Sequence, residues 1–261
     1  MKKYFRVWWK MSSMSLMAQI SHPLGSIGFL LGKIVRIAFF FAFIIAIFRH
    51  IKSLAGYSLS ETALFFLTFN IVDISAQILF RGIYSARRAV TEGDFDFYLI
   101  QPCSALFRLS MTTFDFMDAI TLLPVLVMTG EILSRFFSPV FFIHCLLYFF
   151  LTLNAVLIAS SFHILVAGLA VRTQELENTI WIYRDIMFMG RFPSDVYGPL
   201  FQLFLTFILP IAVMTSFPVR AFLGLLSPQW IVYSFALSGS LIGLSLWFWK
   251  GSVRQYTSSS S

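Results

Sequence analysis

Long apolar segments alternate with short polar segments along this chain of 261 residues. A stretch of about 20 predominantly apolar residues can cross a lipid bilayer as a helix. The pattern therefore predicts an all-α membrane protein, with six spans in one bundle over residues 30–249. The expected spans are approximately Leu30–Phe48, Thr62–Phe80, Phe114–Ile132, Pro139–Val171, Pro199–Phe217 and Ile231–Trp249.

The fourth apolar stretch, Pro139–Val171, is longer than a bilayer requires. As a continuous helix it would extend for about 50 Å, whereas the hydrocarbon core is about 30 Å thick. We therefore expect this helix either to kink or to project beyond the membrane.

The first 25 residues mix aromatic and basic side chains, as in "MKKYFRVWWKM". This composition is typical of a helix that lies in the membrane interface, with its aromatic rings at the level of the lipid headgroups. Pro23 and Gly25 are expected to end this N-terminal interfacial helix. Lys33 and Arg36 follow near the start of the first span, where long basic side chains can snorkel to the interface.

Composition and charge agree with a membrane protein and add an orientation. The chain is 58% hydrophobic and 12% charged, whereas a soluble domain is about 25% charged. If the N-terminus is inside, the outer loops hold only four of the 19 Lys and Arg residues: Arg49, Lys52, Arg135 and Arg220. The positive-inside rule then places both termini, including the tail at 250–261, in the cytoplasm, with the spans in the cell membrane. The net charge of +7 is explained by this topology, so we expect no nucleic-acid partner.

A short polar loop, "RRAVTEGDFDFYLIQP", separates the second and third spans on the expected cytoplasmic side. Charged residues and aromatic residues alternate around a glycine. The members are Arg87, Arg88, Glu92, Gly93, Asp94, Phe95, Asp96, Phe97 and Tyr98. A helix that docks on a soluble partner needs apolar anchors for affinity and charges for register. The pattern also fits a solvated loop whose bases hold the membrane surface, and it leaves both interpretations open.

Four polar residues lie on one face of the second span: Asn70, Asp73, Gln77 and Arg81. An ionisable group inside the bilayer is a candidate functional site by default, and Asp73 could serve an ion-coupled carrier. The alternative is a packing face whose polar groups bond to a neighbouring helix. We favour packing, because a single stripe is not a relay.

The remaining polar residues offer no second chemistry. Cys103 and Cys145, like His144 and His163, lack the spacing of a metal site. Asp115 and Asp118 suit the positive N-terminus of the third helix. No stretch matches G-x-x-x-x-G-K-[ST], the loop that cradles nucleotide phosphates, so we expect no cofactor on this chain and no catalytic residue.

Two segments carry a resemblance to a known family. They are "EGDFDFYLIQPCSALFR", Glu92 to Arg108, and "RFPSDVYGPLFQLFLTFILPIAVMTSFPVRAFLG", Arg191 to Gly224. Both resemble segments of ABC-2-type transporter permeases, the membrane-spanning components of ATP-binding-cassette exporters. Cys103 departs from the family pattern.

The resemblance implies a role for each end of the bundle. The polar loop would be the cytoplasmic coupling helix, resting on a separate ATP-binding subunit that carries ATP and Mg. The interfacial helix would be a connecting helix on the same subunit. Pro210–Pro228 would form short re-entrant helices at the outer side, before the last span.

The resemblance also implies an assembly. Two copies of the ATP-binding subunit would serve two permease subunits, paired through the first and fifth spans, and we favour a homologous hetero-partner over a homodimer. The substrate is expected to be amphipathic or lipid-like. Most of the 32 Phe residues are expected to pack against lipid or neighbouring helices, and some could line the path of such a substrate. An ion-coupled carrier centred on Asp73 and a non-transporting membrane scaffold are the alternatives.

Overall fold

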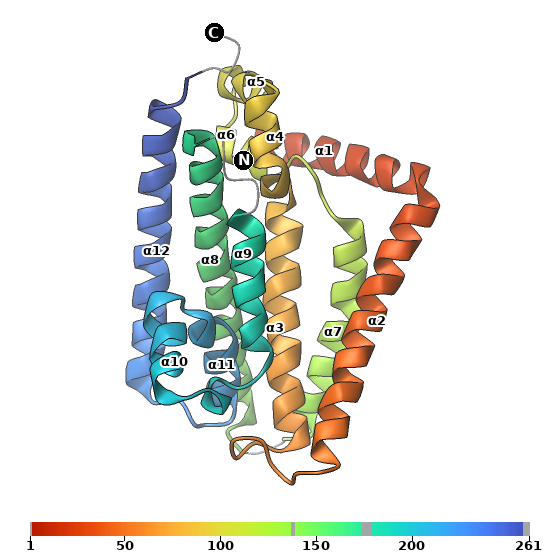
Figure 1. The fold of residues 1–261 in the computed structure, drawn as a ribbon, viewed down its shortest axis with the longest axis vertical. Coiled ribbons are helices and arrows are strands. Elements are labelled where there is room, and N and C mark those ends of the chain that lie inside the picture. Colours follow the sequence, from red (N-terminus) through yellow and green to blue (C-terminus); the bar gives the residue numbers. More distant parts are fainter. Residues whose placement is uncertain (1, 137–138, 174–178, 258–261) are drawn as a thin grey trace.

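The computed structural model describes residues 2–136, 139–173 and 179–257, and within these ranges it contains helices and no strand. Five of the helices are long and apolar enough to cross a membrane, and a bent pair makes a sixth candidate. The five are α2 (Pro23–Phe48), α3 (Leu59–Phe80), α7 (Phe116–Ser134), α8 (Phe141–Thr173) and α12 (Pro228–Arg254). They form one bundle (Figure 1), which confirms the expected all-α membrane fold.

Local signals explain where several helices begin. Ser58 and Glu61 form a capping box at the start of α3, so that two otherwise unpaired backbone N–H groups are satisfied. The Asp115 side chain accepts a hydrogen bond from the Asp118 backbone N–H at the start of α7, 3.1 Å away. Pro23 and Pro228 occupy first-turn positions in α2 and α12, where a missing N–H costs nothing.

The N-terminal helix, α1 (Lys2–Ser21), lies across the end of the bundle, nearly perpendicular to the spans (Figure 1). The chain then turns at His22 and enters α2 directly at Pro23. The expectation that Pro23 and Gly25 end a helix was wrong at this point, because Pro23 begins the next helix. The first span is thereby longer than the sequence pattern indicated.

Helix α3 is the centre of the bundle. It packs against α7, α8, α2 and α11 (Ile211–Phe222), and nearly every residue from Thr62 to Gln77 is buried. Helix α2 leans away from the other spans at its α1 end (Figure 1) and buries only two of its residues, Lys33 and Ile44.

The fourth span forms one uninterrupted helix, α8, of 33 residues. Its last turns pack beneath a short helix, α4 (Ala86–Thr91), and share a buried cluster with Ile83 and Val90. Of the two expected outcomes, a kink is not observed, because α8 contains no break.

The expected fifth span, Pro199–Phe217, is not one straight helix, because it corresponds to a bent pair that is either a broken span or a re-entrant loop. The chain first runs into the bundle along α9 (Thr179–Met187) and two short turns, η2 (Phe188–Arg191) and η3 (Ser194–Val196). It then forms α10 (Pro199–Leu203), the π-helical turn η4 (Phe204–Ile208) and α11. The segment bends by 101° before α11, because Pro210 cannot continue a helical hydrogen-bond ladder. A continuous apolar pattern had concealed this break.

Candidate functional site

The polar loop between α3 and α7 folds as a helix–turn–helix at the α1 end of the bundle (Figure 1). A 3-10 turn, η1 (Arg81–Ser85), leads from α3 into α4, and α5 (Asp94–Ile100) follows. Gly93 joins α4 to α5 with φ of 83°, a left-handed conformation that is strained for residues with a side chain. Asp94 and Asp96 occupy the first turn of α5, where negative charge suits the helix dipole.

Phe95 is fully buried within the chain itself. Its ring packs edge-on against Trp249 of α12, with 6.1 Å between centroids, and against Tyr256, at 5.1 Å. Phe95 therefore anchors α5 against the end of a neighbouring helix and is not available to fill a groove on a partner. Phe95 thereby fixes α5 to the C-terminal end of α12.

The other face of α5 exposes apolar side chains. Phe97 is 62% exposed and Ile100 79% exposed. Tyr98 is half-buried, with the Arg108 guanidinium 5.5 Å from its ring centroid. Since α5 caps the end of α12, this apolar surface lies beyond the spanning helices rather than among them.

Charges surround this apolar surface. Arg88 and Glu92 form an exposed pair with 3.9 Å between Nε and Oε2, and an exposed pair of this kind contributes little to stability. Arg87 is half-buried, and Asp94 is exposed. The residues named from the sequence are therefore divided into an inner anchor and an outward face.

The polar stripe on α3 is buried and bonded. Asn70 donates to the Phe66 carbonyl oxygen at 2.7 Å, and Gln77 Nε2 donates to Asp73 Oδ2 at 2.9 Å. Asp73 also lies 3.7 Å from Nη2 of Arg184 on α9. Asn70 and Gln77 are bonded within α3, and only Asp73 has a partner on a neighbouring element, as the packing interpretation requires.

Arg81 does not belong to the polar stripe on α3, because this helix ends at Phe80. Its Nε lies 3.5 Å from Oδ2 of Asp115 at the start of α7. Asp115 thus caps one helix and neutralises the base that follows another.

Three basic residues occupy unexpected positions. Lys33 was expected to snorkel to the interface, but it is buried and forms an ion pair with Asp118. Arg184 and Arg191 were assigned to a cytoplasmic loop, whereas they lie on α9 and η2 within the bundle. The second error arose because α9 was not predicted from the sequence. The sequence did contain a signal for α9. The segment "TIWIYRDIM" is amphipathic, as a helix packed in the bundle would be, but it is too short for a span.

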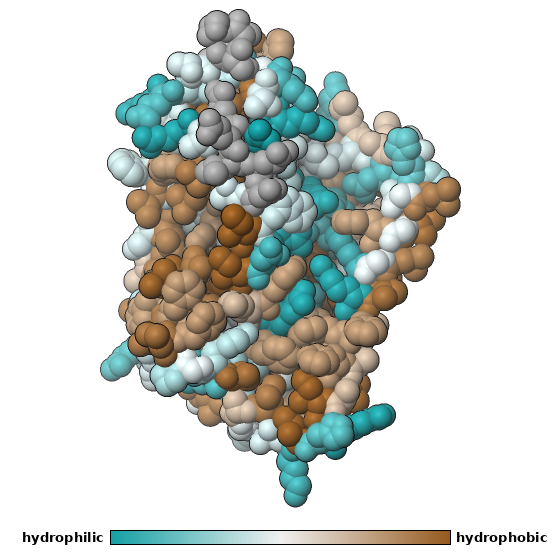
Figure 2. Space-filling view, in the orientation of Figure 1, coloured by the Kyte–Doolittle hydropathy of each residue, from teal (hydrophilic) through white to brown (hydrophobic). Residues whose placement is uncertain are grey.

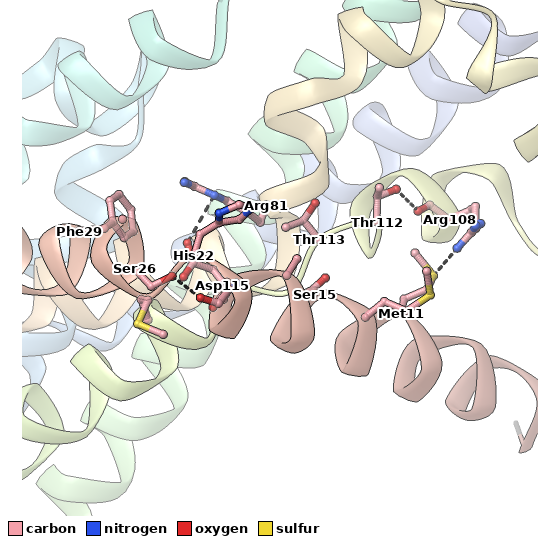
Figure 3. A pocket seen from close by; sticks show the side chains of 15 residues that line it. Met11, Ser15, His22, Ser26, Phe29, Arg81, Arg108, Thr112, Thr113 and Asp115 are labelled. Atoms are coloured by element: carbon pink, nitrogen blue, oxygen red, sulfur yellow. Dashed lines mark hydrogen bonds and ion pairs between the residues drawn. The ribbon is translucent and has the colours of Figure 1, made fainter.

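Two pockets adjoin this charged region. The larger, of about 740 Å³, lies between α1, α2 and the segment leading into α7, and Figure 3 shows its side chains. The smaller, of about 380 Å³, lies between α2, α3 and α9. Phe29 and Arg81 line both pockets, so the two spaces adjoin.

A second polar cluster lies at the opposite end of the bundle. The Tyr57 hydroxyl donates to Asp195 Oδ2 at 3.1 Å, and Asp195 Oδ1 lies 3.6 Å from Arg220. Burial, reinforced by the negative charge of Asp195, raises the pKa of Tyr57 to about 12. The cluster ties the loop before α3 to η3 and α11.

His163 and the cysteines do not form a metal site. The described residues contain no group of three His, Cys, Asp or Glu side chains able to hold an ion. His163 is buried, and its Nδ1 lies 2.8 Å from the Ala159 carbonyl oxygen. Cys103 and Cys145 are both free thiols.

Comparison with known proteins identifies the family. Residues 34–260 match the family model described as ABC-2 family transporter protein. No curated protein and no solved structure matches the chain. The match covers every span from within α2 onward, including the helix–turn–helix and the bent pair. The chain therefore belongs to the ABC-2 family and is a membrane permease of an ABC transporter.

Proposed function

We propose that this permease subunit exports an amphipathic or lipid-like substrate and that a separate ATP-binding subunit hydrolyses the ATP that drives export. The helix–turn–helix of α4 and α5 would be the surface on which that subunit rests. Family membership supports the transport role, and the exposed apolar face of α5 supports the docking surface.

The exposure of Phe97 and Ile100 is the observation that carries this proposal. Both belong to α5, whose opposite side is fixed by Phe95 to the end of α12. An apolar face outside the spans has no lipid tails to cover it, and such a face marks a protein contact. The neighbouring Arg88, Glu92 and Asp94 would set its register.

The experiment is to replace Phe97 with Ala and to measure three quantities in the same reconstituted vesicles: retention of the ATP-binding subunit, ATPase rate and transport. Truncating a central anchor costs about 2 kcal/mol or more, so we expect reduced retention or ATP hydrolysis uncoupled from transport. Phe142→Ala is the matched control, because Phe142 is 77% exposed at the opposite end of the bundle.

The outcomes separate the candidate functions. If Phe97→Ala assembles and transports as the wild type does, α5 is not the docking surface. If Asp73→Asn then abolishes transport while assembly remains intact, an ion-coupled carrier replaces the exporter. Recovery of the chain alone under gentle detergent, with no nucleotide-binding subunit, would favour the non-transporting scaffold.

Gly93 gives an independent probe of the same surface. A β-branched side chain at φ of 83° is strained by about 1–3 kcal/mol. Gly93→Val should therefore reorient α5 and reduce retention of the ATP-binding subunit, while Gly251→Val, on α12 with open space around it, should not. Equal retention by both variants would contradict a fixed docking geometry.

The assembly that we propose contains two permease subunits and two copies of the ATP-binding subunit, which binds ATP and Mg. We favour a homologous second permease over a second copy of this chain. The lightly covered surface of α2 supports pairing on that side. Mass measurement of the intact complex tests this, and one permease per two ATP-binding subunits would overturn it.

We further propose that the chain lies in the cell membrane with both termini in the cytoplasm. The positions of α1 and α5 at one end of the bundle, together with the basic-residue distribution, support this orientation (Figure 1). In a background with Cys103 and Cys145 replaced by Ser, Ser53→Cys should react with an impermeant maleimide on intact cells, and Thr257→Cys should react only after lysis. The reverse pattern would invert the orientation.

A further inference from the structure

The bundle holds more buried or half-buried bases than carboxylates near α9. Three ion pairs join Lys33 to Asp118, Arg81 to Asp115 and Arg184 to Asp73. Two further bases, Arg36 and Arg191, form no ion pair with any described carboxylate.

Arg36 and Arg191 belong to the same electrostatic region. Both interact with Asp73, and Arg191 is repelled by Arg36 and Arg184. Arg191 packs against rings instead of a carboxylate, with its guanidinium 4.1 Å from the Phe188 centroid. Asp185 also belongs to α9, but it is exposed and forms no ion pair with these bases. The region therefore carries an uncompensated positive charge.

This charge lies about halfway along a candidate membrane span, α2. Arg36 is about 20 Å along α2 from its start at Pro23, at 1.5 Å per residue. Figure 2 shows a hydrophilic area within the otherwise hydrophobic face, over α3 and between α9 and α2. Unpaired basic groups within a membrane are costly and mark functional pathways.

The bases converge on the smaller pocket. Lys33, Arg36, Arg81 and Arg184 contribute to its lining, and Phe29 and Trp181 form aromatic parts of its wall. Its volume of about 380 Å³ lies within the range of pockets that hold small ligands, roughly 300–1,000 Å³. Three of these four bases are paired with carboxylates, so the charge of Arg36 is the one in the lining that is left to attract an anion.

Two buried donors lack an acceptor. The Nε–H groups of Arg184 and Arg191 are both buried and have no hydrogen-bond partner. Arg184 as a whole is only 8% exposed. An unsatisfied buried donor of this kind costs about 1–3 kcal/mol. A guanidinium pairs well with the oxygens of a phosphate, which it can contact with two parallel bonds.

A route from the interface leads to this pocket. The larger pocket lies beneath α1, and Figure 3 shows Met11 and Arg108 at one end of it and Phe29 and Arg81 at the other. Phe29 and Arg81 also line the smaller pocket. A headgroup could therefore pass from the interface to Arg36 by way of Arg108 and Arg81. The apolar residues of α1 and α2 would meanwhile contact an acyl chain.

We propose that the pocket at Arg36 and Arg184 binds the phosphate headgroup of an anionic amphiphile, which enters from the interface beneath α1. This assignment rests on the proposed export of a lipid-like substrate and specifies its headgroup. Arg36, which has no carboxylate partner to leave unpaired, is the residue whose removal tests the site most directly.

Trp181 reports on occupancy because it lines the pocket. The purified chain in mixed micelles is titrated with brominated phosphatidylglycerol or brominated phosphatidylcholine, and the quenching lost in Trp181→Phe is assigned to Trp181. We expect the anionic lipid to quench Trp181 at about a tenfold lower mole fraction, as one charge-assisted bond allows. Arg36→Gln should remove this preference, while Arg36→Lys and the exposed, outer-loop variant Arg49→Gln should retain it.

Several outcomes would overturn the site. They are equal quenching by the two lipids, a full preference in Arg36→Gln, or displacement of the anionic lipid by inorganic phosphate, which would indicate a site for the free anion. If Arg36→Gln fails to fold, the wild-type comparison of the two lipids and the phosphate competition still decide. The assay uses neither ATP nor the ATP-binding subunit. A lipid preference without ATP-driven transport therefore contradicts the proposed function alone, and transport without the preference contradicts this site alone.

Discussion

Helices α3 and α2 both cross the membrane, but they use their apolar residues in opposite ways. In α2 the most apolar stretch has a mean hydropathy of 2.3 and only 11% of it is buried, whereas the stretch that begins in α3 has a mean hydropathy of 1.8 and is 78% buried. The less apolar helix is the central one. A surface that faces lipid must be apolar, while a surface that faces protein can carry polar groups if they are bonded.

The polar residues of each helix show the same contrast. Asn70, Asp73 and Gln77 are buried in α3 and have partners in the bundle. In α2, Lys33 is the one buried base and it too has a partner, Asp118, whereas Arg36 has none. Buried polar groups thus mark where helices meet, and an unpartnered base marks where something else is needed.

Breaking the central ion pair should have the largest effect. Asp73→Ala leaves the Arg184 charge buried without its partner, which costs about 3–5 kcal/mol. We expect a marked loss of thermal stability in detergent. Asp73→Leu combined with Arg184→Leu should recover most of it, because removing both charges together is close to neutral.

A double variant as unstable as Asp73→Ala would show that the contacts of Asp73 with Gln77 and the other bases contribute more to stability than its pair with Arg184. The matched control is Glu131→Ala, which breaks the exposed pair with Arg135. That change should cost less than about 1 kcal/mol.

A pair of phenylalanines compares the two helices directly. Phe66 of α3 is 2% exposed and stacks on Phe40 with 4.3 Å between centroids, whereas Phe39 of α2 is 76% exposed. Phe66→Ala leaves a cavity in packed protein, and we expect it to cost roughly 3–5 kcal/mol. Phe39→Ala exchanges one lipid-facing apolar group for a smaller one and should change the melting temperature little. Equal effects would contradict the peripheral position of α2.

The smallest effect is expected from spin labels on exposed faces. Val35 of α2 is 62% exposed and Val127 of α7 is 71% exposed, so labels at both positions should be accessible to lipid-dissolved oxygen in the isolated subunit. If a second permease covers α2, accessibility at Val35 should fall in the assembled transporter while that at Val127 remains. A loss at Val127 alone would move the pairing surface to α7.

The spans were predictable where one physical signal was sufficient. Four apolar stretches were long enough to identify α2, α3, α7 and α8, and the 33 residues of α8 are one continuous helix. The last stretch identified α12 in the same way. The bend in the fifth was not predicted, because hydropathy does not register a bend, although Pro199 and Pro210 were visible in the sequence as points where a helix could break.

The site was only partly predictable. The spacing of residues in the sequence predicted the polar stripe on α3 and showed the alternation of charged and aromatic residues around Gly93. The partners of these residues were not, because Asp73 and Arg184 are far apart in sequence and no local pattern connects them. The burial of Phe95 depends in the same way on Trp249 and Tyr256, at the other end of the chain.

The unbroken α8 has a mechanical consequence. This helix is about 50 Å long. One of its ends packs against α4, and along its length it packs against α11 and α12. Phe95 in turn fixes α5 to the end of α12. A displacement of α4 and α5 would therefore be transmitted to two long helices, α8 and α12, at once. That displacement would reach α11 through its packing on α8. Helix α2, which buries only two of its residues, would be the span most free to move relative to the others.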